Sequence, residues 1–337
     1  MYRMRTIYRS AVVGLGNIGF QFSLDTKRQG TWSHVDAYLK SGRTALAGAV
    51  EINRSTAERF TAIHPDIPVY PTIGDLFKDQ SIDIISVAVS TALHFPVFSE
   101  IAEYPIRAIF CEKPLSDSPE RSRDMVRIAG EKNIVLAVNY TRRWEHTYQM
   151  ARDMVMEGKI GSVRSIHAFY SGHIRTMGSH LFDTLHMIAG VEPLEVSAVT
   201  AGDAPDPSTS GWVQCKRDAF VTFSATGKKE DLIFEIDLVG DEGRLTIGQN
   251  GSEIAWALFR ESQRYSGYRE PVRQVITMPE AKDRFIEAVR DIAAVLDGER
   301  NEPQCTGRDG LWVDHLIDAA LRSARDGGVP VRIGRVP

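Results

Sequence analysis

The sequence has few cysteines and no long apolar run, and each shortage excludes a class of protein. Its 337 residues include only Cys111, Cys215 and Cys305, which are too few and too scattered for a disulfide framework or a CxxC metal knuckle. We therefore expect three thiols, none of them catalytic. No run of 18 apolar residues occurs, and arginines interrupt the amino-terminal stretch where a signal peptide needs apolar residues. The sequence predicts a cytoplasmic protein with no membrane partner.

An excess of charge of one sign is also missing. The 40 basic and 44 acidic residues leave a net charge of -4, so we expect no general attraction to nucleic acid or to an anionic membrane. The chain is long enough for about two domains, and its 43% apolar content excludes disorder as the main state. A small neutral or anionic molecule is the partner that this composition favours.

The first 140 residues alternate short apolar runs with amphipathic stretches. This pattern is typical of a parallel sheet covered by helices on both faces. The expected strands are residues 11–13, 44–51, 82–89, 106–111 and 134–138. Before the last of them, Ser118 and Pro119 predict the start of a capped helix. We predict a doubly wound α/β Rossmann domain over residues 1–118, completed by a crossover and its last strand over residues 119–144.

The pattern changes after residue 140, where strand signals dominate. A helix over residues 145–157 is expected to end at Gly158. The expected strands that follow are residues 163–170, 194–199, 218–225, 231–239 and 244–248. The period-two alternation of residues 234–238 predicts an antiparallel sheet with one packed face.

The connections and the end of the chain complete this second domain. GDEG at residues 240–243 predicts a hairpin, and the Gly, Pro and Ser content of residues 201–211 predicts a surface loop. Two closing helices have apolar faces over residues 285–296 and 312–321. We predict an α+β domain with a large, mostly antiparallel sheet over residues 145–337, whose closing helices pack back toward the first domain.

A glycine-rich turn follows the first strand directly. In the segment from Gly14 through Gly16 to Gly19, the first glycine permits a sharp turn and the second lets a pyrophosphate approach the backbone. The third lets the following helix lie close to the strand, and the amino terminus of that helix favours phosphate. We therefore predict that this turn, with Asn17 and Ile18, binds a dinucleotide.

Glu51 ends the second strand and is the expected partner of the adenosine ribose. A carboxylate there accepts both ribose hydroxyls and repels a 2'-phosphate, which favours NAD over NADP. Glu51 lies 32 residues after Gly19, where about 20 is usual, and residues 23–34 are the expected extra length. The alternative is that Arg54 neutralises a 2'-phosphate, so NADP stays open.

Lys113 is the expected acid-base group. It follows the strand 106–111, at the edge of the sheet where ligands bind, and Pro114 lies behind it. Hydride leaves a secondary alcohol only when a base takes the hydroxyl proton, and Lys113 fits as base in oxidation and acid in reduction. Because a free lysine has a pKa of about 10.4, burial or a second cation must lower it. The alternatives are an exposed loop lysine or a salt bridge to Glu112.

Three segments together resemble the Gfo/Idh/MocA family of oxidoreductases. They are GLGNIG at 14–19, EKP at 112–114 and GSHLFD at 178–183, and the likeness runs from Ser10 to the closing helices. The resemblance implies hydride transfer between a nicotinamide and a sugar, polyol or related alcohol. It also implies association of two or four copies through the second domain's sheet, and a place for Glu112 and Lys113 beside the cofactor.

The resemblance also implies further cofactor and substrate contacts. It places Ser90, Thr91 and His94 beside the ribose and nicotinamide, although a helix start capped by Thr91 explains them equally. It places Asn139 and an arginine at the substrate cleft. Arg142, Arg143 and Arg175 are candidates for binding a phosphate or carboxylate, and the alternative is that they are solvated surface arginines.

His180 is the expected proton relay to solvent, since its unperturbed pKa is near 6.5, and Asp183 lies one helical turn away to orient it. Relatives often carry an acidic residue four positions earlier, where this chain has Thr176. Either His180 works with Lys113 alone, or another residue such as Tyr140 or His173 substitutes. A metal site formed by His180, Asp183 and His186 is a further alternative.

The favoured function is therefore an NAD(P)-dependent oxidoreductase acting on a carbohydrate-like alcohol or ketone. A second candidate uses bound NAD transiently, through a 3-keto intermediate, for elimination or glycoside cleavage. A third is a sensor that binds nucleotide without catalysis.

Overall fold

The computed structural model describes residues 6–202, 204–216, 219–279 and 282–334. The chain divides into two compact units, one made of Met1–Trp144 and Ala281–Asp314, the other of Glu145–Glu280 and His315–Pro337. Each unit is built around a sheet of its own. Within the described ranges, no helix is both long and apolar enough to cross a lipid bilayer.

The first unit contains a six-stranded parallel sheet in the order β3-β2-β1-β4-β5-β6. Its strands are β1 (Tyr8–Val13), β2 (Thr44–Val50), β3 (Val69–Tyr70), β4 (Ile84–Val87), β5 (Ala108–Cys111) and β6 (Val135–Val138). The five expected strands form, and the short β3 adds an edge. The strand order reverses between β1 and β4, which opens a crevice at their carboxyl ends, the usual ligand site of such sheets.

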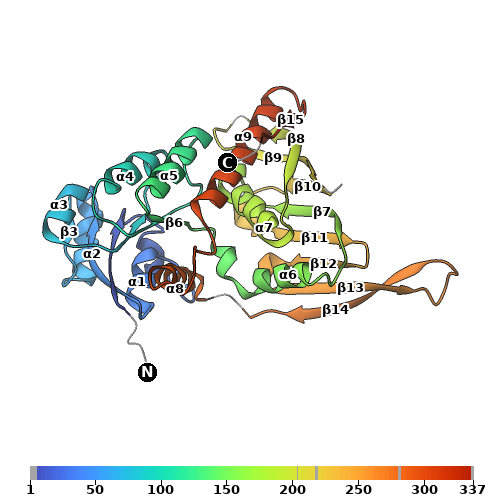
Figure 1. Ribbon diagram of the computed structural model, residues 1–337, viewed down its shortest axis with the longest axis horizontal. Coiled ribbons are helices and arrows are strands. Elements are labelled where there is room, and N and C mark those ends of the chain that lie inside the picture. Colours follow the sequence, from blue (N-terminus) through green and yellow to red (C-terminus); the bar gives the residue numbers. More distant parts are fainter. Residues whose placement is uncertain (1–5, 203, 217–218, 280–281, 335–337) are drawn as a thin grey trace. The chain divides into compact units, whose positions relative to one another are not determined.

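Helices cover this sheet and complete the expected doubly wound fold. They are α1 (His34–Lys40), α2 (Arg54–Ile63), α3 (Ile73–Asp79), α4 (His94–Ile101), α5 (Pro119–Glu131) and α8 (Arg284–Leu296). The predicted cap of α5 is confirmed, because the Ser118 hydroxyl accepts from the Arg121 amide at 3.3 Å. Although α8 follows the second sheet in sequence, it lies beside α1 (Figure 1). The first unit therefore uses two separate stretches of chain.

The second unit contains a nine-stranded sheet in the order β14-β13-β12-β11-β7-β10-β9-β8-β15. Every neighbouring pair is antiparallel except β10 with β7. Its strands are β7 (Val163–Tyr170), β8 (Pro193–Ala201), β9 (Ser208–Cys215), β10 (Phe220–Ala225), β11 (Phe234–Gly240), β12 (Gly243–Gly248), β13 (Glu253–Glu261), β14 (Arg269–Thr277) and β15 (Val331–Arg332). Three helices accompany it: α6 (His146–Met156), α7 (Ser179–Ala189) and α9 (Gly307–Arg325), the last shared with the first unit.

Several predictions for this unit are confirmed. In β11 the side chains of Phe234, Ile236 and Leu238 are buried, as the alternation indicated. The strands β11 and β12 pair as a hairpin across residues 241–242. The helix α6 ends just before Gly158, which has a positive φ of 70°. Predicted strand 218–225 appears as β10, and its first residue, Asp218, lies outside the described residues.

The prediction of a loop over residues 201–211 is wrong in part, because β9 begins at Ser208. A side chain at Gly211 would place its Cβ 2.1 Å from the Ser197 carbonyl oxygen of β8, so only glycine fits this close strand pairing. The predicted strand over 231–239 starts later, at Phe234, because Leu232 takes a left-handed backbone with φ of 51°. The pair β13 and β14, which extends as a long ribbon in Figure 1, was not expected at all.

Candidate active site

The three glycines of the turn after β1 have different surroundings. Gly14 has a φ of +93°, and a Cβ there would lie 2.7 Å from the Ala88 carbonyl oxygen at the end of β4. A Cβ at Gly19 would lie 2.0 Å from the Gly14 oxygen, so the first and third glycines are required by packing. Beyond its chain neighbours, no atom of the described chain lies within 4 Å of a Cβ built at Gly16. The open backbone at Gly16 is the space that a pyrophosphate needs.

The helix expected to begin at this turn is interrupted. The amide of Phe20 donates to the Gly16 oxygen at 2.9 Å, as in a first helical turn. The chain then leaves the helix through a 3-10 turn (Gln21–Leu24), and the amides of His34 and Val35 donate to the oxygens of Ile18 and Gly19 at 3.1 Å. Helix α1 thus resumes where the first turn stopped. This excursion accounts for the extra length between the glycine turn and Glu51 that the spacing indicated.

Glu51 lies beside the glycine turn, at the end of β2. Its Oε2 accepts from the Leu15 amide at 2.8 Å, and its Oε1 accepts from the Asn53 amide at 2.8 Å. A cavity of about 320 Å³ adjoins it, lined among others by Gly14, Thr72 and Leu93. Each carboxylate oxygen keeps a second lone pair for a hydroxyl. The cavity, the carboxylate and the open glycine fit the adenosine and pyrophosphate of a dinucleotide.

The guanidinium of Arg54 forms an ion pair within its own helix. Its Nε pairs with the Glu58 carboxylate at 2.7 Å, one turn along α2, and its side chain is 92% exposed. A ligand phosphate would have to compete with Glu58 for this guanidinium.

Lys113 follows β5 at the carboxyl edge of the sheet and is half-buried, with a cis peptide bond to Pro114. Glu112 before it is buried and accepts from the Lys113 amide at 3.3 Å. Burial raises the pKa of Glu112, but hydrogen bonds from His34 and Asn139 and the charge of Lys113 outweigh it and lower this pKa overall. Burial or a second cation would lower the pKa of Lys113. In the structure Lys113 is partly buried, and the neighbouring charged group is the Glu112 carboxylate.

The side chains of Glu112 and His94 are both hydrogen-bonded within the protein. Both oxygens of Glu112 are engaged within the protein, Oε1 by His34 at 2.9 Å and Oε2 by the Lys113 amide. The His94 ring is 1% exposed, with Nδ1 3.0 Å from the Pro114 oxygen and Nε2 3.1 Å from the Val89 oxygen. His94 thus connects the end of β4 to the segment after Lys113, and its expected place beside the ribose stays a prediction.

Ser90 and Thr91 remain available at the same edge. Ser90 is exposed and Thr91 is half-buried, at the start of a 3-10 turn (Thr91–Leu93) that leads into α4. The expected cap does not form, because neither hydroxyl makes a capping hydrogen bond there. Their hydroxyls therefore keep their hydrogen-bonding capacity for a ligand.

Three polar residues after β6 are buried: Asn139, Arg142 and Arg143. Asn139 is 2% exposed, and its Nδ2 donates to Glu112 while its buried Oδ1 has no partner in the described structure. Arg142 and Arg143 are also buried. Arg143 pairs with Asp309 at 3.0 Å and donates to the Gln304 oxygen at 2.7 Å. These contacts give Arg143 a structural role, and its expected role in substrate binding stays a prediction.

In the second unit, a π-helical turn (Ile174–Gly178) leads directly into α7, which carries His180. The Asp206 carboxylate accepts from the Arg175 amide at 2.8 Å and from the Thr176 hydroxyl at 2.7 Å. A carboxylate therefore lies at the position where the sequence has only a threonine. The sequence analysis did not identify Asp206, because this residue lies in the loop after β8, far along the chain from Thr176.

The remaining residues singled out from the sequence are Asp183, His186 and the three cysteines. Asp183 is fully buried on α7, and the His186 ring faces the Val191 oxygen at 3.4 Å. Among the described residues, no group of three metal-binding side chains is arranged to hold an ion. The three cysteines are free thiols, and burial raises the pKa of Cys111 and that of Cys215, the latter to about 12. Buried protonated thiols are inert.

Comparison with known proteins gives two family matches. A model described as "Oxidoreductase family, NAD-binding Rossmann fold" matches residues 8–140, and one described as "Oxidoreductase family, C-terminal alpha/beta domain" matches residues 164–333. Inositol 2-dehydrogenase of Rhizobium meliloti (strain 1021) is 26% identical over 291 residues, which is 76% of this chain and 82% of the relative.

Solved structures share the fold over nearly the whole chain. The WlbA dehydrogenase from Bordetella pertussis, in complex with NADH and UDP-GlcNAcA, matches with a TM-score of 0.82 and 20% identity, covering 99% of this chain and all of that one. The super-repressor mutant of Gal80p from Saccharomyces cerevisiae matches with a TM-score of 0.82 and 15% identity, covering 98% and 99%. The same fold thus carries both a dehydrogenase and a repressor, so function must be argued from residues.

Proposed function

The chain belongs to the Gfo/Idh/MocA family of NAD(P)-dependent oxidoreductases, and on this premise we propose that it transfers hydride between NAD and a secondary alcohol or ketone of a sugar, polyol or sugar derivative. One observation carries the proposal. The open glycine turn, the Glu51 cavity and Lys113 all lie at the carboxyl edge of one parallel sheet. The names of relatives, such as inositol 2-dehydrogenase, support a polyol-like substrate.

The proposed chemistry divides between the cofactor and the protein. When bound, the nicotinamide supplies the hydride acceptor in oxidation and the donor in reduction. Lys113 takes the hydroxyl proton at its Nζ in oxidation and returns it in reduction. On the second unit, we propose that His180 passes a proton toward solvent.

Steady-state absorbance at 340 nm with a panel of polyols and sugars tests this function. Net NADH formation with at least one polyol supports a dehydrogenase. Conversion of a substrate without net NADH would favour transient oxidation through a 3-keto intermediate. Binding of NAD with no turnover of any compound would favour a nucleotide sensor.

We expect NAD to bind more tightly than NADP, because Glu51 faces the cavity and Glu58 occupies Arg54. Glu51→Gln removes the negative charge and keeps one acceptor oxygen, which serves only one of the two backbone amides. Hydrogen bonds to charged groups contribute about 1.5 to 3 kcal/mol, so we expect NAD affinity to fall about tenfold to a hundredfold. Calorimetric titration with both cofactors measures the change.

Glu58→Gln is the matched control, since Glu58 lies nearby on α2 but outside the cavity. We expect it to leave NAD affinity unchanged. Unchanged NAD affinity in Glu51→Gln would contradict the proposed ribose contact.

We also propose that Asp206 is the carboxylate that works with His180. Its contacts to Arg175 and Thr176 fix it on the turn that immediately precedes α7. Burial raises the pKa of the Tyr170 phenol, and the nearby Asp206 raises it further. A fixed anion stabilises an imidazolium that forms while a proton passes through.

Asp206→Asn is expected to lower kcat about tenfold to a hundredfold, because the amide keeps an acceptor oxygen but loses the charge. Asp153→Asn is the control, since Asp153 is exposed on α6 and pairs only with Arg152 in the described structure. Initial rates with saturating NAD compare the two variants. Equal rates in both variants would exclude a catalytic part for Asp206.

We propose Asn139 and Arg142 of the first unit and, separately, Arg175 of the second unit as substrate contacts, because a guanidinium pairs with an anionic group. The buried, unpartnered Oδ1 of Asn139 supports its proposed contact with the substrate.

We further propose that two or four copies associate through the sheet of the second unit. Its exposed aromatic side chains, Phe169 and Phe220, support this.

A further inference from the structure

A series of buried polar side chains, connected by hydrogen bonds, ends at Glu112. The Tyr38 hydroxyl lies 2.7 Å from Ser86 Oγ, which lies 2.9 Å from Nδ1 of His34. Nε2 of His34 lies 2.9 Å from Glu112 Oε1. Tyr38, Ser86 and His34 are completely buried and Glu112 is 7% exposed. We call these four residues the buried relay. Its members come from α1, β4 and the end of β5, so only folding brings them together.

The hydrogen-bonding capacities of these groups give each contact one direction. The ionised Glu112 only accepts, so His34 donates from Nε2. Nδ1 of His34 then accepts from the Ser86 hydroxyl, whose oxygen accepts from Tyr38. Burial raises the pKa of Tyr38, which keeps this phenol a donor.

The contact between His34 and Ser86 has one favourable direction. If Nδ1 of His34 donated to Ser86, the Ser86 oxygen would accept from both neighbours and its own hydrogen would be left buried without an acceptor along the relay. The ring is also held in place by edge-to-face contacts with Phe110 and Phe285, at centroid distances of 4.9 and 5.4 Å. The relay therefore holds His34 in one orientation and one tautomer.

We propose that Tyr38, Ser86 and His34 are positioning residues for Lys113, because they hold the Glu112 carboxylate ionised and fixed beside the Lys113 backbone. The inference rests on the proposed role of Lys113 as acid-base group. Among the described residues, the titratable groups that act on Glu112 or respond to it are His34 from α1, Lys113 after it and the Cys111 thiol before it. A fixed anion favours the protonated amine, so the relay sets the pH at which the amine becomes a base.

Ser86→Ala tests this by removing one buried oxygen in the middle of the relay. We expect kcat to fall about threefold to tenfold, the loss of about one hydrogen bond, with KM within about twofold. The acidic limb of kcat in the oxidation direction is expected to move to lower pH by about half a unit or more, because the loosened anion favours the protonated amine less. Tyr38→Phe, at the far end of the relay, is expected to give a smaller shift of the same sign.

Ser10→Ala is the matched control. Ser10 is fully buried on β1, next to β4, and its hydroxyl donates to the Ala45 oxygen at 3.2 Å, away from the relay. Both variants lose a buried hydroxyl in the same sheet, so general destabilisation affects both, and melting temperatures measure it. We expect Ser10→Ala to leave the pH limb unchanged. An equal shift in both variants, or none in Ser86→Ala, overturns the proposal.

A second measurement separates this inference from the proposed function. The nitrogen NMR spectrum of histidine-labelled protein, assigned with His34→Gln, reports the tautomer of His34 without turnover. We expect the Nε2-protonated form in the native chain and also in Ser86→Ala, because Glu112 still accepts from Nε2 in that variant. A native His34 protonated on Nδ1 overturns the relay even if Lys113 proves essential. Full activity in Lys113→Met refutes the proposed role of Lys113 instead, and no NADH formation with any polyol or sugar refutes the proposed function, whatever the spectrum shows.

Discussion

Lys113→Met is expected to lower kcat about 10² to 10⁴-fold, the usual contribution of a positioned acid-base group. Methionine keeps the length of the side chain but has no group that exchanges a proton. The backbone amide of Lys113, which donates to Glu112, is unchanged by the substitution. NAD affinity is therefore expected to stay within about twofold, since the glycine turn and Glu51 are untouched. Single-turnover rates and NAD titrations measure the two quantities separately.

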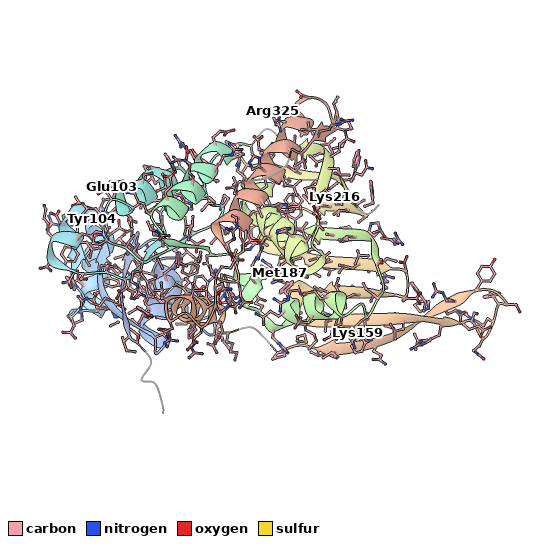
Figure 2. The ribbon with its side chains drawn as sticks, viewed as in Figure 1. Glu103, Tyr104, Lys159, Met187, Lys216 and Arg325 are labelled. Carbon is pink, nitrogen blue, oxygen red and sulfur yellow. The ribbon has the colours of Figure 1, made fainter. Side chains whose placement is uncertain are left out.

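Lys132→Met is the control for this experiment. Lys132 follows α5 and pairs with Glu103 at 2.7 Å, at the surface position that Figure 2 labels. Exposed pairs of this kind contribute about 0 to 1 kcal/mol to stability, so the variant is expected to keep the native kcat. A kcat for Lys113→Met within about threefold of the native value would remove Lys113 from the chemistry, and the acid-base group would have to be sought elsewhere.

The strands that the sequence predicted are those with an apolar side on a packed face. The five predicted strands of the first sheet are mostly buried and read as apolar runs. In contrast, β14 is exposed at nearly every position and contains Pro271, so no alternation of burial marks it. In β9, Gly211 is required by a close strand pairing that only the folded chain reveals. Edge strands and tight pairings are set by neighbours, which local patterns do not contain.

The candidate site divides in the same way. The glycine turn and Lys113 were predictable because their surroundings are local, a strand followed at once by the chemical group. Asp206 contacts Thr176 across 30 residues of sequence, and His34 contacts Glu112 across 78. The proline on either side of Asp206 marks a rigid loop, but nothing nearby in sequence indicates what the carboxylate accepts from. Partners of this kind need the tertiary structure.

Gly16→Ala is expected to separate cofactor binding from folding. A Cβ at Gly16 meets no atom of the described chain beyond its neighbours, so the free energy of unfolding is expected to change by less than about 1 kcal/mol. The added methyl occupies the space through which a pyrophosphate approaches the backbone. Losing even one charge-assisted hydrogen bond of about 1.5 to 3 kcal/mol predicts at least a tenfold loss of NAD affinity.

Gly14→Ala and Gly19→Ala are expected to show the opposite pattern. Alanine at Gly14 must adopt a φ of +93°, and at Gly19 its Cβ would overlap the Gly14 oxygen at 2.0 Å. Backbone strain of this kind costs about 1 to 3 kcal/mol, so both variants are expected to unfold at lower denaturant concentration than the native chain. Denaturant midpoints and NAD titrations on all three variants measure the difference. If Gly16→Ala bound NAD as tightly as the native chain, the pyrophosphate would not cross the turn at Gly16, and the fit of this site to a dinucleotide would fail.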